Sequence, residues 1–433
     1  MKLTFLGILL LLGQWLWAYQ IEGQVQGLAS GKAFLGHYYA SAAQTILLDT
    51  ANINTKGYLK FNKNKALASG MYFIQLPDKK RFEFYFNQEN TLIFSTNIGQ
   101  IILKMTWQNS DENANYYDLL RAIEGQDANL QRENKKLFYQ SYPNAKITAW
   151  LKAQDFVEVP VDVAYKNGKM DTSTVFSYQK KHYFDNLNLK ESDLLHSSFL
   201  EEKLLFYLQK MTYPVSDSIL VATDRIMALA GSEIQKYFAI KLTSLYENPP
   251  FVGGDKVCVE AIDRYYTAMP ALWNASTLGK MAEKAKKMRP LLLGQIIPDL
   301  TITDPTGKEH RLLDQQSPIT ILYLYSLDCP HCKEHAPKLA QFQQKMASKG
   351  VKVFAVAVES DAPRWKKFIS TYHTENLLNG IDSQHKYDLS NRYNIVEFPM
   401  NYILDSQKRI IGKRINPAMF EAFLDYYKQL NKK

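Results

Sequence analysis

The sequence predicts a multidomain protein with an N-terminal antiparallel β-sandwich, a central all-α domain and a C-terminal α/β domain. Three patterns predict it. Hydrophobic residues alternate with a period of two at the start, follow a helical period in the middle, and form continuous apolar runs between helical segments at the end. We expect a leader at residues 1–18 and domains at 19–109, 110–289 and 290–433, since one domain commonly needs about 100 to 200 residues.

The leader has the features of a secretory signal peptide. Met1 and Lys2 give a positive start, residues 3–12 are apolar, and Ala18 is a small residue before a polar continuation. A transmembrane anchor is the alternative, but the apolar stretch is shorter than the ~20 residues that span a bilayer. No cysteine lies near the expected cleavage site, so we predict an exported protein of the periplasm or cell envelope that is not a lipoprotein.

The net charge of +9 favours neither nucleic acid nor an anionic membrane as a partner. Lys and Arg are scattered, apart from short clusters such as residues 79–81 and 432–433. Because a binding surface for nucleic acid needs concentrated positive charge, we interpret the basic residues as a solvated surface.

Residues 19 to about 107 contain short period-two runs such as "YQIEGQVQG", "GMYFIQL" and "RFEFYFN", broken by Gly, Asn, Asp and Lys. This spacing is typical of an antiparallel β-sandwich. It contains no recognisable catalytic constellation.

From about residue 110 to 290 the period becomes helical. Tyr116, Leu119 and Ile123 share one helix face, and the Pro and Gly residues of 248–254 indicate a loop. Cys258 lies among valines in an expected helix, where a lone thiol is usually a small buried hydrophobe.

The C-terminal part contains two apolar strands, "PITILYLYSL" and "VKVFAVAV", separated by a helical segment. Continuous apolar runs indicate strands buried on both faces, and the crossover between them predicts a βαβ unit. A helix around residues 365–372, the strands "MNYIL" and "RIIGKRI", and a helix from about 417 to 430 complete the expected order.

Two of the three cysteines, Cys329 and Cys332, enclose a Pro-His pair where the first apolar strand ends and a helix begins. Three cysteines are too few for a structural disulfide framework, so a close pair in an exported protein favours redox activity. Pro330 suits the first helical position, where free backbone N–H groups and the helix dipole stabilise a thiolate. We therefore expect Cys329 to attack a disulfide and Cys332 to resolve the intermediate. His331 would favour the thiolate, whereas Asp328 would oppose it.

With this cysteine pair in its strand–helix context, residues 291–433 resemble the thioredoxin superfamily, specifically the exported ResA/TlpA-like thiol–disulfide oxidoreductases. The motifs are "GQIIPDLTITDPTGKEHRL", "CPHC", "VFAVAVE" and "VEFPMNYILD". The resemblance implies a thioredoxin fold and a cis proline beside the cysteines, here Pro399 with Phe398 before it. It also implies envelope protein thiols or disulfides as substrates, a membrane redox donor or acceptor, and no cofactor beyond the dithiol. The whole chain resembles a Bacteroidota group of exported proteins with β-rich and helical domains of unassigned function before the thioredoxin domain.

The chain departs from that family at two positions. Many relatives have Trp where Asp328 stands, and ResA-like members often have a glutamate three residues after the second cysteine, where this chain has His335. Glu334 is displaced by one residue, which rotates a helical side chain by about 100°, so we expect that it cannot substitute. His335 could carry the proton; an exposed helical histidine without a role is the alternative.

Two other classes of protein compete with an oxidoreductase. Cys329, Cys332, His331 and His335 are suitable ligands for Cu(I) or Zn, but no second ligand pair completes a closed site. Lys333 follows the second cysteine, which excludes the CxxCH motif of haem attachment. The remaining alternative is a redox-inactive module that binds a partner. We predict an oxidoreductase without a metal, acting more readily as a reductant, whose substrate choice depends on the preceding domains.

Overall fold

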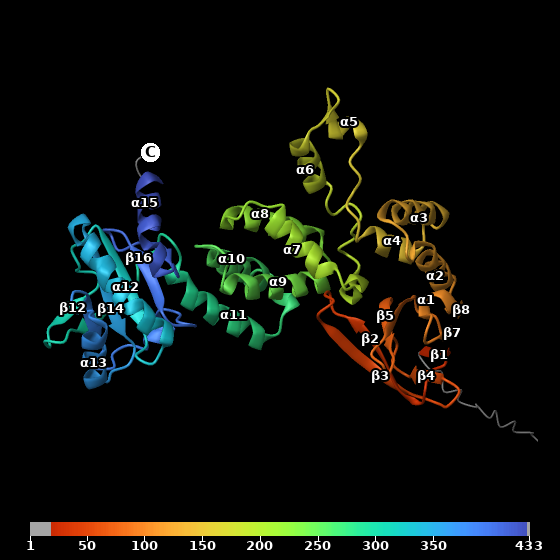
Figure 1. Cartoon of the computed structure of the whole chain (residues 1–433), viewed down its shortest axis with the longest axis horizontal. Helices are drawn as coiled ribbons and strands as arrows, with labels where there is room; N and C mark the ends of the chain where they lie inside the picture. Colours follow the sequence, from red (N-terminus) through yellow and green to blue (C-terminus); the bar gives the residue numbers. More distant parts are fainter. Residues whose placement is uncertain (1–18, 431–433) are drawn as a thin grey trace, which may run out of the picture. The chain divides into compact units, whose positions relative to one another are not determined.

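The computed structural model describes residues 19–430, and the predicted signal peptide lies outside them (Figure 1). The chain divides into two compact units. The first contains the residues up to Met211 together with Arg225–Ile234, and the second contains Thr212–Asp224 together with the residues from Gln235 onwards. The helical region therefore contributes to both units. Within residues 19–430, no helix is long and apolar enough to cross a bilayer.

The N-terminal residues form two four-stranded sheets, with strand orders β4-β1-β7-β8 and β3-β2-β5-β6. All pairs are antiparallel except β1 and β7, which are parallel. The alternating burial of β1 confirms the period-two pattern of the sequence. The strands are β1 (Tyr19–Gln26), β2 (Gly31–Tyr38), β3 (Thr45–Ile53), β4 (Tyr58–Lys63), β5 (Gly70–Gln75), β6 (Arg81–Phe86), β7 (Thr91–Asn97) and β8 (Thr106–Gln108), with the short helix α1 (Ile101–Lys104) before β8.

The central region is helical, as predicted. Its helices are α2 (Asp111–Ile123), α3 (Ala128–Ser141), α4 (Lys146–Lys152), α5 (Val161–Ala164), α6 (Thr172–Lys181), α7 (Leu200–Lys210), α8 (Ser216–Leu229), α9 (Ser232–Glu247), α10 (Asp255–Ala261) and α11 (Ala275–Met288). Side-chain caps begin several of them: the Ser110 hydroxyl accepts from the Asn113 N–H at the start of α2.

A small hairpin interrupts these helices, which the sequence analysis did not predict. It pairs β9 (Tyr165–Lys166) with β10 (Lys169–Met170). Asn167 and Gly168 between them both have positive φ, at 52° and 73°. An Asn-Gly pair readily adopts this conformation, which matches the twist of paired strands.

The C-terminal part is a mixed seven-stranded sheet with the order β12-β11-β15-β14-β13-β16-β17. Its strands are β11 (Thr301–Thr303), β12 (Glu309–Arg311), β13 (Ile319–Tyr325), β14 (Val351–Ala357), β15 (Leu378–Ile381), β16 (Met400–Leu404) and β17 (Ile410–Lys413). β13, β14 and β15 are parallel, whereas β16 is antiparallel to β13. This is the α/β architecture of a thioredoxin-like domain.

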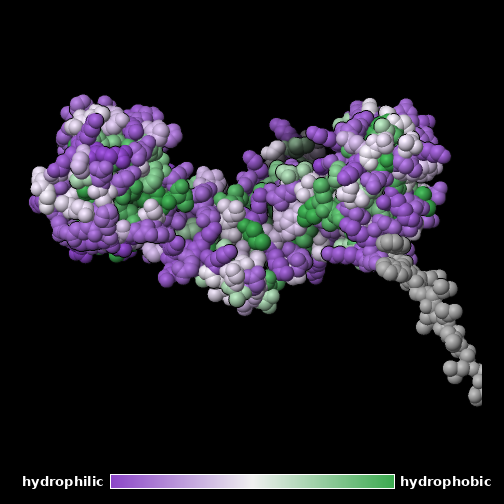
Figure 2. Space-filling model, turned by 90° about the horizontal axis from the view of Figure 1, so that it is seen from below, coloured by the Kyte–Doolittle hydropathy of each residue, from purple (hydrophilic) through white to green (hydrophobic). Residues whose placement is uncertain are grey.

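The central strand β13 is buried on both faces, as its apolar sequence predicted. Ile321 and Tyr323 belong to one hydrophobic cluster, and Leu322 and Leu324 belong to another. The accompanying helices are α12 (Pro330–Met346), α13 (Ala362–Tyr372), α14 (Leu389–Arg392) and α15 (Phe420–Leu430). The visible surface is mostly hydrophilic with separate hydrophobic patches (Figure 2).

Candidate active site

The strand register brings the two cysteines and the Phe398–Pro399 segment to the same edge of the sheet. Leu324, near the end of β13, pairs with Met400, the first residue of β16. Cys329 lies shortly after β13, and Pro399 immediately precedes β16. The Phe398–Pro399 peptide bond is cis, as the family resemblance implied.

Cys329 caps the N-terminus of α12. Its sulfur accepts a hydrogen bond from the Cys332 N–H at 3.3 Å, and its thiol donates to the Phe398 carbonyl oxygen at 3.5 Å. Both cysteines are free thiols, so the structure shows the reduced dithiol. Cys329 is partly exposed. The N–H donor and the helix N-terminus thus point their positive dipole ends at this sulfur.

Cys332 differs from Cys329 because it is buried, with 1% of its surface exposed. Burial raises the pKa of its thiol, and the hydrogen bond with Cys329 raises it further. The two thiols therefore have unequal access to a substrate. This asymmetry supports an attacking role for Cys329 and a resolving role for Cys332.

Glu359 is a site residue that the sequence analysis missed. Its carboxylate accepts from the Ser326 hydroxyl at 2.5 Å and from the Leu327 N–H at 3.1 Å. These bonds tie the loop before the cysteines to the segment after β14. The Glu359 charge also contributes to the raised pKa of Cys332. The available signal was an acidic residue at the end of the "VFAVAVE" strand, beside the strand that leads to the cysteines.

The residues next to the cysteines face solvent to different degrees. Pro330 and His331 are exposed, and the Asp328 carboxylate pairs with Arg364 at 2.5 Å. Glu334 is exposed and pairs with Lys338 at 2.7 Å. This agrees with the expectation that Glu334 does not substitute for the family glutamate.

His335 is half-buried rather than fully exposed, and its role as a proton carrier stays a prediction. Its Nδ1 atom is buried without a hydrogen-bond partner in the described part of the chain. Burial lowers the pKa of the imidazole, which favours its neutral form. A neutral imidazole has an acceptor nitrogen, but His335 shows no hydrogen bond to either sulfur among residues 19–430.

The third cysteine lies apart in α10. Cys258 is fully buried, and burial raises the pKa of its thiol to about 12. It is a small core side chain, as predicted. Among residues 19–430, no group of three or more His, Cys, Asp or Glu side chains is arranged to hold a metal ion.

Comparison with known proteins identifies two segments. Residues 293–413 match the AhpC/TSA family, and residues 127–289 match a domain of unknown function, DUF5106. The C-terminal domain belongs to the AhpC/TSA family. This assignment agrees with the thioredoxin-like sheet and with the position of the cysteine pair.

Two curated relatives of the chain are thiol–disulfide oxidoreductases named ResA. The one from Geobacillus kaustophilus is 25% identical over 139 residues, which cover 31% of this chain and 78% of the relative. The one from Geobacillus thermodenitrificans is 23% identical over 118 residues, which cover 27% of this chain and 66% of the relative. The chain is therefore a homologue of thiol–disulfide oxidoreductases.

Solved structures also resemble the chain. A domain of a possible thiol-disulfide isomerase from Cytophaga hutchinsonii is 39% identical, with a TM-score of 0.32, and the match covers 33% of this chain and 99% of that domain. A thioredoxin-like protein from Bacteroides caccae is 15% identical, with a TM-score of 0.51, and the match covers 63% of this chain and 98% of that protein. The second likeness extends beyond the AhpC/TSA domain and concerns the fold alone.

Proposed function

We propose that the protein is an exported thiol–disulfide oxidoreductase that reduces disulfides in proteins of the cell envelope. The observation that carries this proposal is the placement of Cys329, a partly exposed sulfur at a helix N-terminus beside the Phe398 carbonyl, with Cys332 buried one turn further on. This arrangement supplies an accessible nucleophile and a protected resolving thiol.

The reaction would proceed by two exchanges. The Cys329 thiolate attacks one sulfur of a substrate disulfide, which forms a mixed disulfide and releases the other sulfur as a thiol. Cys332, after losing its proton, attacks the Cys329 sulfur, which forms the Cys329–Cys332 disulfide and releases the second substrate thiol. Two electrons and two protons pass to the substrate. A dithiol donor at the membrane then reduces the pair, and no bound cofactor takes part.

Two observations support the reducing direction. The named curated relatives are ResA proteins. In addition, burial and the nearby Glu359 charge raise the pKa of Cys332, and a thiolate that is poorly stabilised makes the reduced pair a stronger reductant. The Pro-His dipeptide between the cysteines favours the oxidising direction instead, so the reduction potential of the Cys329–Cys332 pair must be measured.

The test is the reduction potential of the pair in glutathione and dithiothreitol buffers, with Cys258→Ser to remove the third thiol. A value near or below about −250 mV supports a reductant, and a value near about −120 mV indicates an oxidant instead. If no reversible two-electron transition occurs, the protein is a redox-inactive binding module.

Export is tested separately from the thiol chemistry. We expect the protein to be recovered from the envelope fraction with its N-terminus beginning just after Ala18. Recovery of the intact leader in the cytoplasmic fraction would contradict this proposal.

A further inference from the structure

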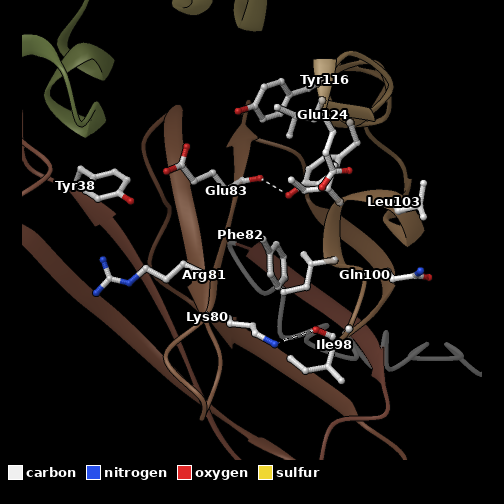
Figure 3. Close-up of a pocket in the computed structure, with 15 residues that line it drawn as sticks. Tyr38, Lys80, Arg81, Phe82, Glu83, Ile98, Gln100, Leu103, Tyr116 and Glu124 are labelled. Atoms are coloured by element: carbon white, nitrogen blue, oxygen red, sulfur yellow. Dashed lines mark hydrogen bonds between the residues drawn. The ribbon is translucent and has the colours of Figure 1, made fainter. Parts of the chain in front are cut away.

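Two cavities lined by described residues differ in how their polar groups are used. The N-terminal β region has a surface pocket of about 710 Å³ (Figure 3). There the Tyr117 hydroxyl donates to the Glu83 carbonyl at 2.9 Å, and the Lys80 ammonium donates to the Ile98 carbonyl at 3.3 Å. The second cavity, of about 10 Å³, is lined in part by Cys332 and contains hydroxyl groups without a partner in the described chain.

The cavity at Cys332 lies in the core of the C-terminal domain, and every residue that lines it is buried. The lining side chains come from α12, α13 and the strands β13, β14 and β15, with two from the segment between α13 and β15: Tyr323, Tyr325, Cys332, Ala336, Leu339, Ala355, Phe368, Thr374, Leu377 and Asn379. A buried water needs a cavity of about 10–15 Å³. This cavity therefore has room for one water molecule.

Two hydroxyl groups in this cavity have no hydrogen-bond partner among residues 19–430. They belong to Tyr323 on β13 and to Thr374 after α13, and each residue is 2% exposed. Buried polar groups are almost always satisfied, and a buried water commonly does so with about three partners. The two hydroxyls and the Cys332 sulfur together offer these three partners.

Both hydroxyls can donate a hydrogen bond near neutral pH. Burial raises the pKa of Tyr323, and the neighbouring sulfurs of Cys332 and Cys329 raise it further. The phenol therefore keeps its proton, and the Thr374 hydroxyl does not ionise. A water held by these two groups can direct one of its own hydrogens at the Cys332 sulfur.

Cys332 needs such a donor because most of its surroundings oppose its ionisation. Burial is the largest cause of the raised pKa of its thiol, followed by the hydrogen bond with Cys329, and the Glu359 charge adds to them. The Ser326 backbone acts in the opposite sense. The remaining titratable residue of the cavity is Tyr325, whose pKa is also raised by burial. Since Cys332 must lose its proton before it attacks, a further donor at its sulfur would speed the resolving step.

We propose that Tyr323 and Thr374 are positioning residues that hold one water against the Cys332 sulfur, where the water donates a hydrogen bond to the thiolate in the resolving step. This inference rests on the proposed function, because it assigns a donor to the thiol that resolves the mixed disulfide. The water forms no covalent bond and carries no electrons. The hydroxyl of Tyr323 has this role rather than its ring, so Tyr323→Phe removes the donor and keeps the packing.

The experiment follows a single oxidation of the reduced full chain, with Cys258→Ser, by dithionitrobenzoate. Cys329 attacks the reagent, which forms a mixed disulfide and releases one thionitrobenzoate. Cys332 then attacks the Cys329 sulfur, which forms the Cys329–Cys332 disulfide and releases the second thionitrobenzoate. Stopped-flow absorbance separates the two releases, and the rate of the second is recorded as a function of pH.

Removing either hydroxyl should slow the second release and leave the first unchanged. For Tyr323→Phe and for Thr374→Val, we expect the pH profile of the second release to move up by about one pH unit, since a hydrogen bond to the thiolate is lost. At neutral pH the rate should fall by about threefold, because the less stable thiolate is also a better nucleophile. The double variant should behave like either single variant, since each change removes the same water.

Tyr402→Phe is the matched control. It also removes a buried tyrosine hydroxyl, but this hydroxyl donates to the Tyr393 carbonyl at 2.7 Å and does not line the cavity. The pH profile of the second release should therefore stay unchanged. A shift as large as that of Tyr323→Phe would overturn the proposal, and so would additive shifts in the double variant.

A crystal structure of the reduced chain tests the water itself. One water should lie within hydrogen-bond distance of the Tyr323 hydroxyl, the Thr374 hydroxyl and the Cys332 sulfur, and Tyr323→Phe should lose it. A cavity without this water would overturn the inference. The kinetic outcomes also separate the two proposals. A chain that never releases the second thionitrobenzoate refutes both, whereas normal release with an unchanged pH profile in Tyr323→Phe refutes only the role of the water.

Discussion

The Cys329 sulfur lies 3.5 Å from the carbonyl oxygen of Phe398. The Cys329 thiol therefore lies directly beside the backbone that precedes Pro399. A substrate chain that pairs with this backbone would hold its own disulfide next to the Cys329 sulfur. Val396, two residues before Phe398, has an apolar side chain that is 53% exposed.

Replacing the resolving cysteine should trap a substrate. In Cys332→Ser the first exchange still occurs at Cys329, but the mixed disulfide persists because no second thiol attacks it. We expect mixed disulfides on non-reducing gels that disappear on adding dithiothreitol. Cys329→Ser should form none, because Cys332 is buried. Equal trapping by both variants would contradict the assigned roles.

Removing the charge of Glu359 should speed the resolving step. Glu359→Gln keeps one acceptor oxygen for the Leu327 N–H, and its amide group can donate to the Ser326 hydroxyl, but it removes a charge that raises the pKa of Cys332. We expect release from a mixed disulfide to accelerate by about threefold at neutral pH, with its pH profile shifted to lower pH. Ser326→Ala is the control, since it retains the charge. Slower release in Glu359→Gln would show instead that the carboxylate accepts the Cys332 proton.

Cys258 should resist alkylation in the folded protein. Burial raises the pKa of its thiol to about 12, so almost no thiolate exists near neutral pH. In Cys329→Ser/Cys332→Ser, we expect negligible reaction with iodoacetamide at pH 8 and rapid reaction in urea, followed by mass spectrometry. Rapid labelling of the folded chain would mean that α10 opens readily.

The ion pair between Lys413 and Asp255 should stabilise the second unit. Lys413 of β17 also donates to the Leu291 carbonyl, and both charged side chains are 8% exposed. Lys413→Met leaves the Asp255 charge buried without its partner, which should cost about 3–5 kcal/mol. The measurement is the extent of Cys258 alkylation at increasing urea concentrations, which gives the midpoint of unfolding for each variant. Cys258 reports on this region because it lies in the same helix, α10, as Asp255.

Two comparisons test whether the buried Lys413–Asp255 ion pair makes this contribution to stability. In the double variant Asp255→Asn/Lys413→Met, the loss in free energy of unfolding should be smaller than the sum of the losses in the two single variants. The reason is that the two groups interact directly. Lys338→Met breaks the exposed pair with Glu334 and should cost less than about 1 kcal/mol. If Lys338→Met and Lys413→Met lowered the free energy of unfolding by similar amounts, burial would not make the Lys413–Asp255 pair more stabilising than an exposed pair.

Acid should destabilise the N-terminal unit through His196. The centroids of the His196 and His37 rings lie 3.9 Å apart, with the rings tilted by 32°. Burial, and after it the His37 charge, lowers the pKa of His196 from 6.5 to about 4. The unfolded chain therefore binds the proton first, so stability is complete above pH 6.5 and falls as pH decreases towards 4. The loss should reach about 3 kcal/mol.

Thermal melting followed by circular dichroism at pH 7 and pH 5 measures the part of this loss that falls between these pH values, about 2 kcal/mol. His196→Gln cannot take up the proton, so its melting temperature should change less between the two pH values. His331→Gln is the control, because His331 is exposed in the other unit. An unchanged pH dependence in His196→Gln would show that other groups carry the acid sensitivity.

Local signals in the sequence were sufficient for several features. The alternation of β1, the apolar run of β13 and the helical start at Pro330 each depend on residues close in the chain, so their elements could be predicted. The Asn167–Gly168 hairpin also carried a local signal, which a search for strands within the helical region would have found.

Other features depend on residues far apart. Glu359 reaches Ser326 across 33 positions because β13 and β14 pair in parallel, and that register follows from packing rather than from either segment alone. The same holds for the burial of His335 and for the pairing of Lys413 with Asp255, which joins residues 158 positions apart.

The sequence by itself determined the order of the elements, the Cys329–Cys332 motif and its place between a strand and a helix, because propensity and periodicity act over a few neighbouring residues. Only the tertiary structure decided which cysteine is accessible and which carboxylate lies beside the loop that precedes them. Those properties depend on strand register and burial, which arise when distant segments pack together.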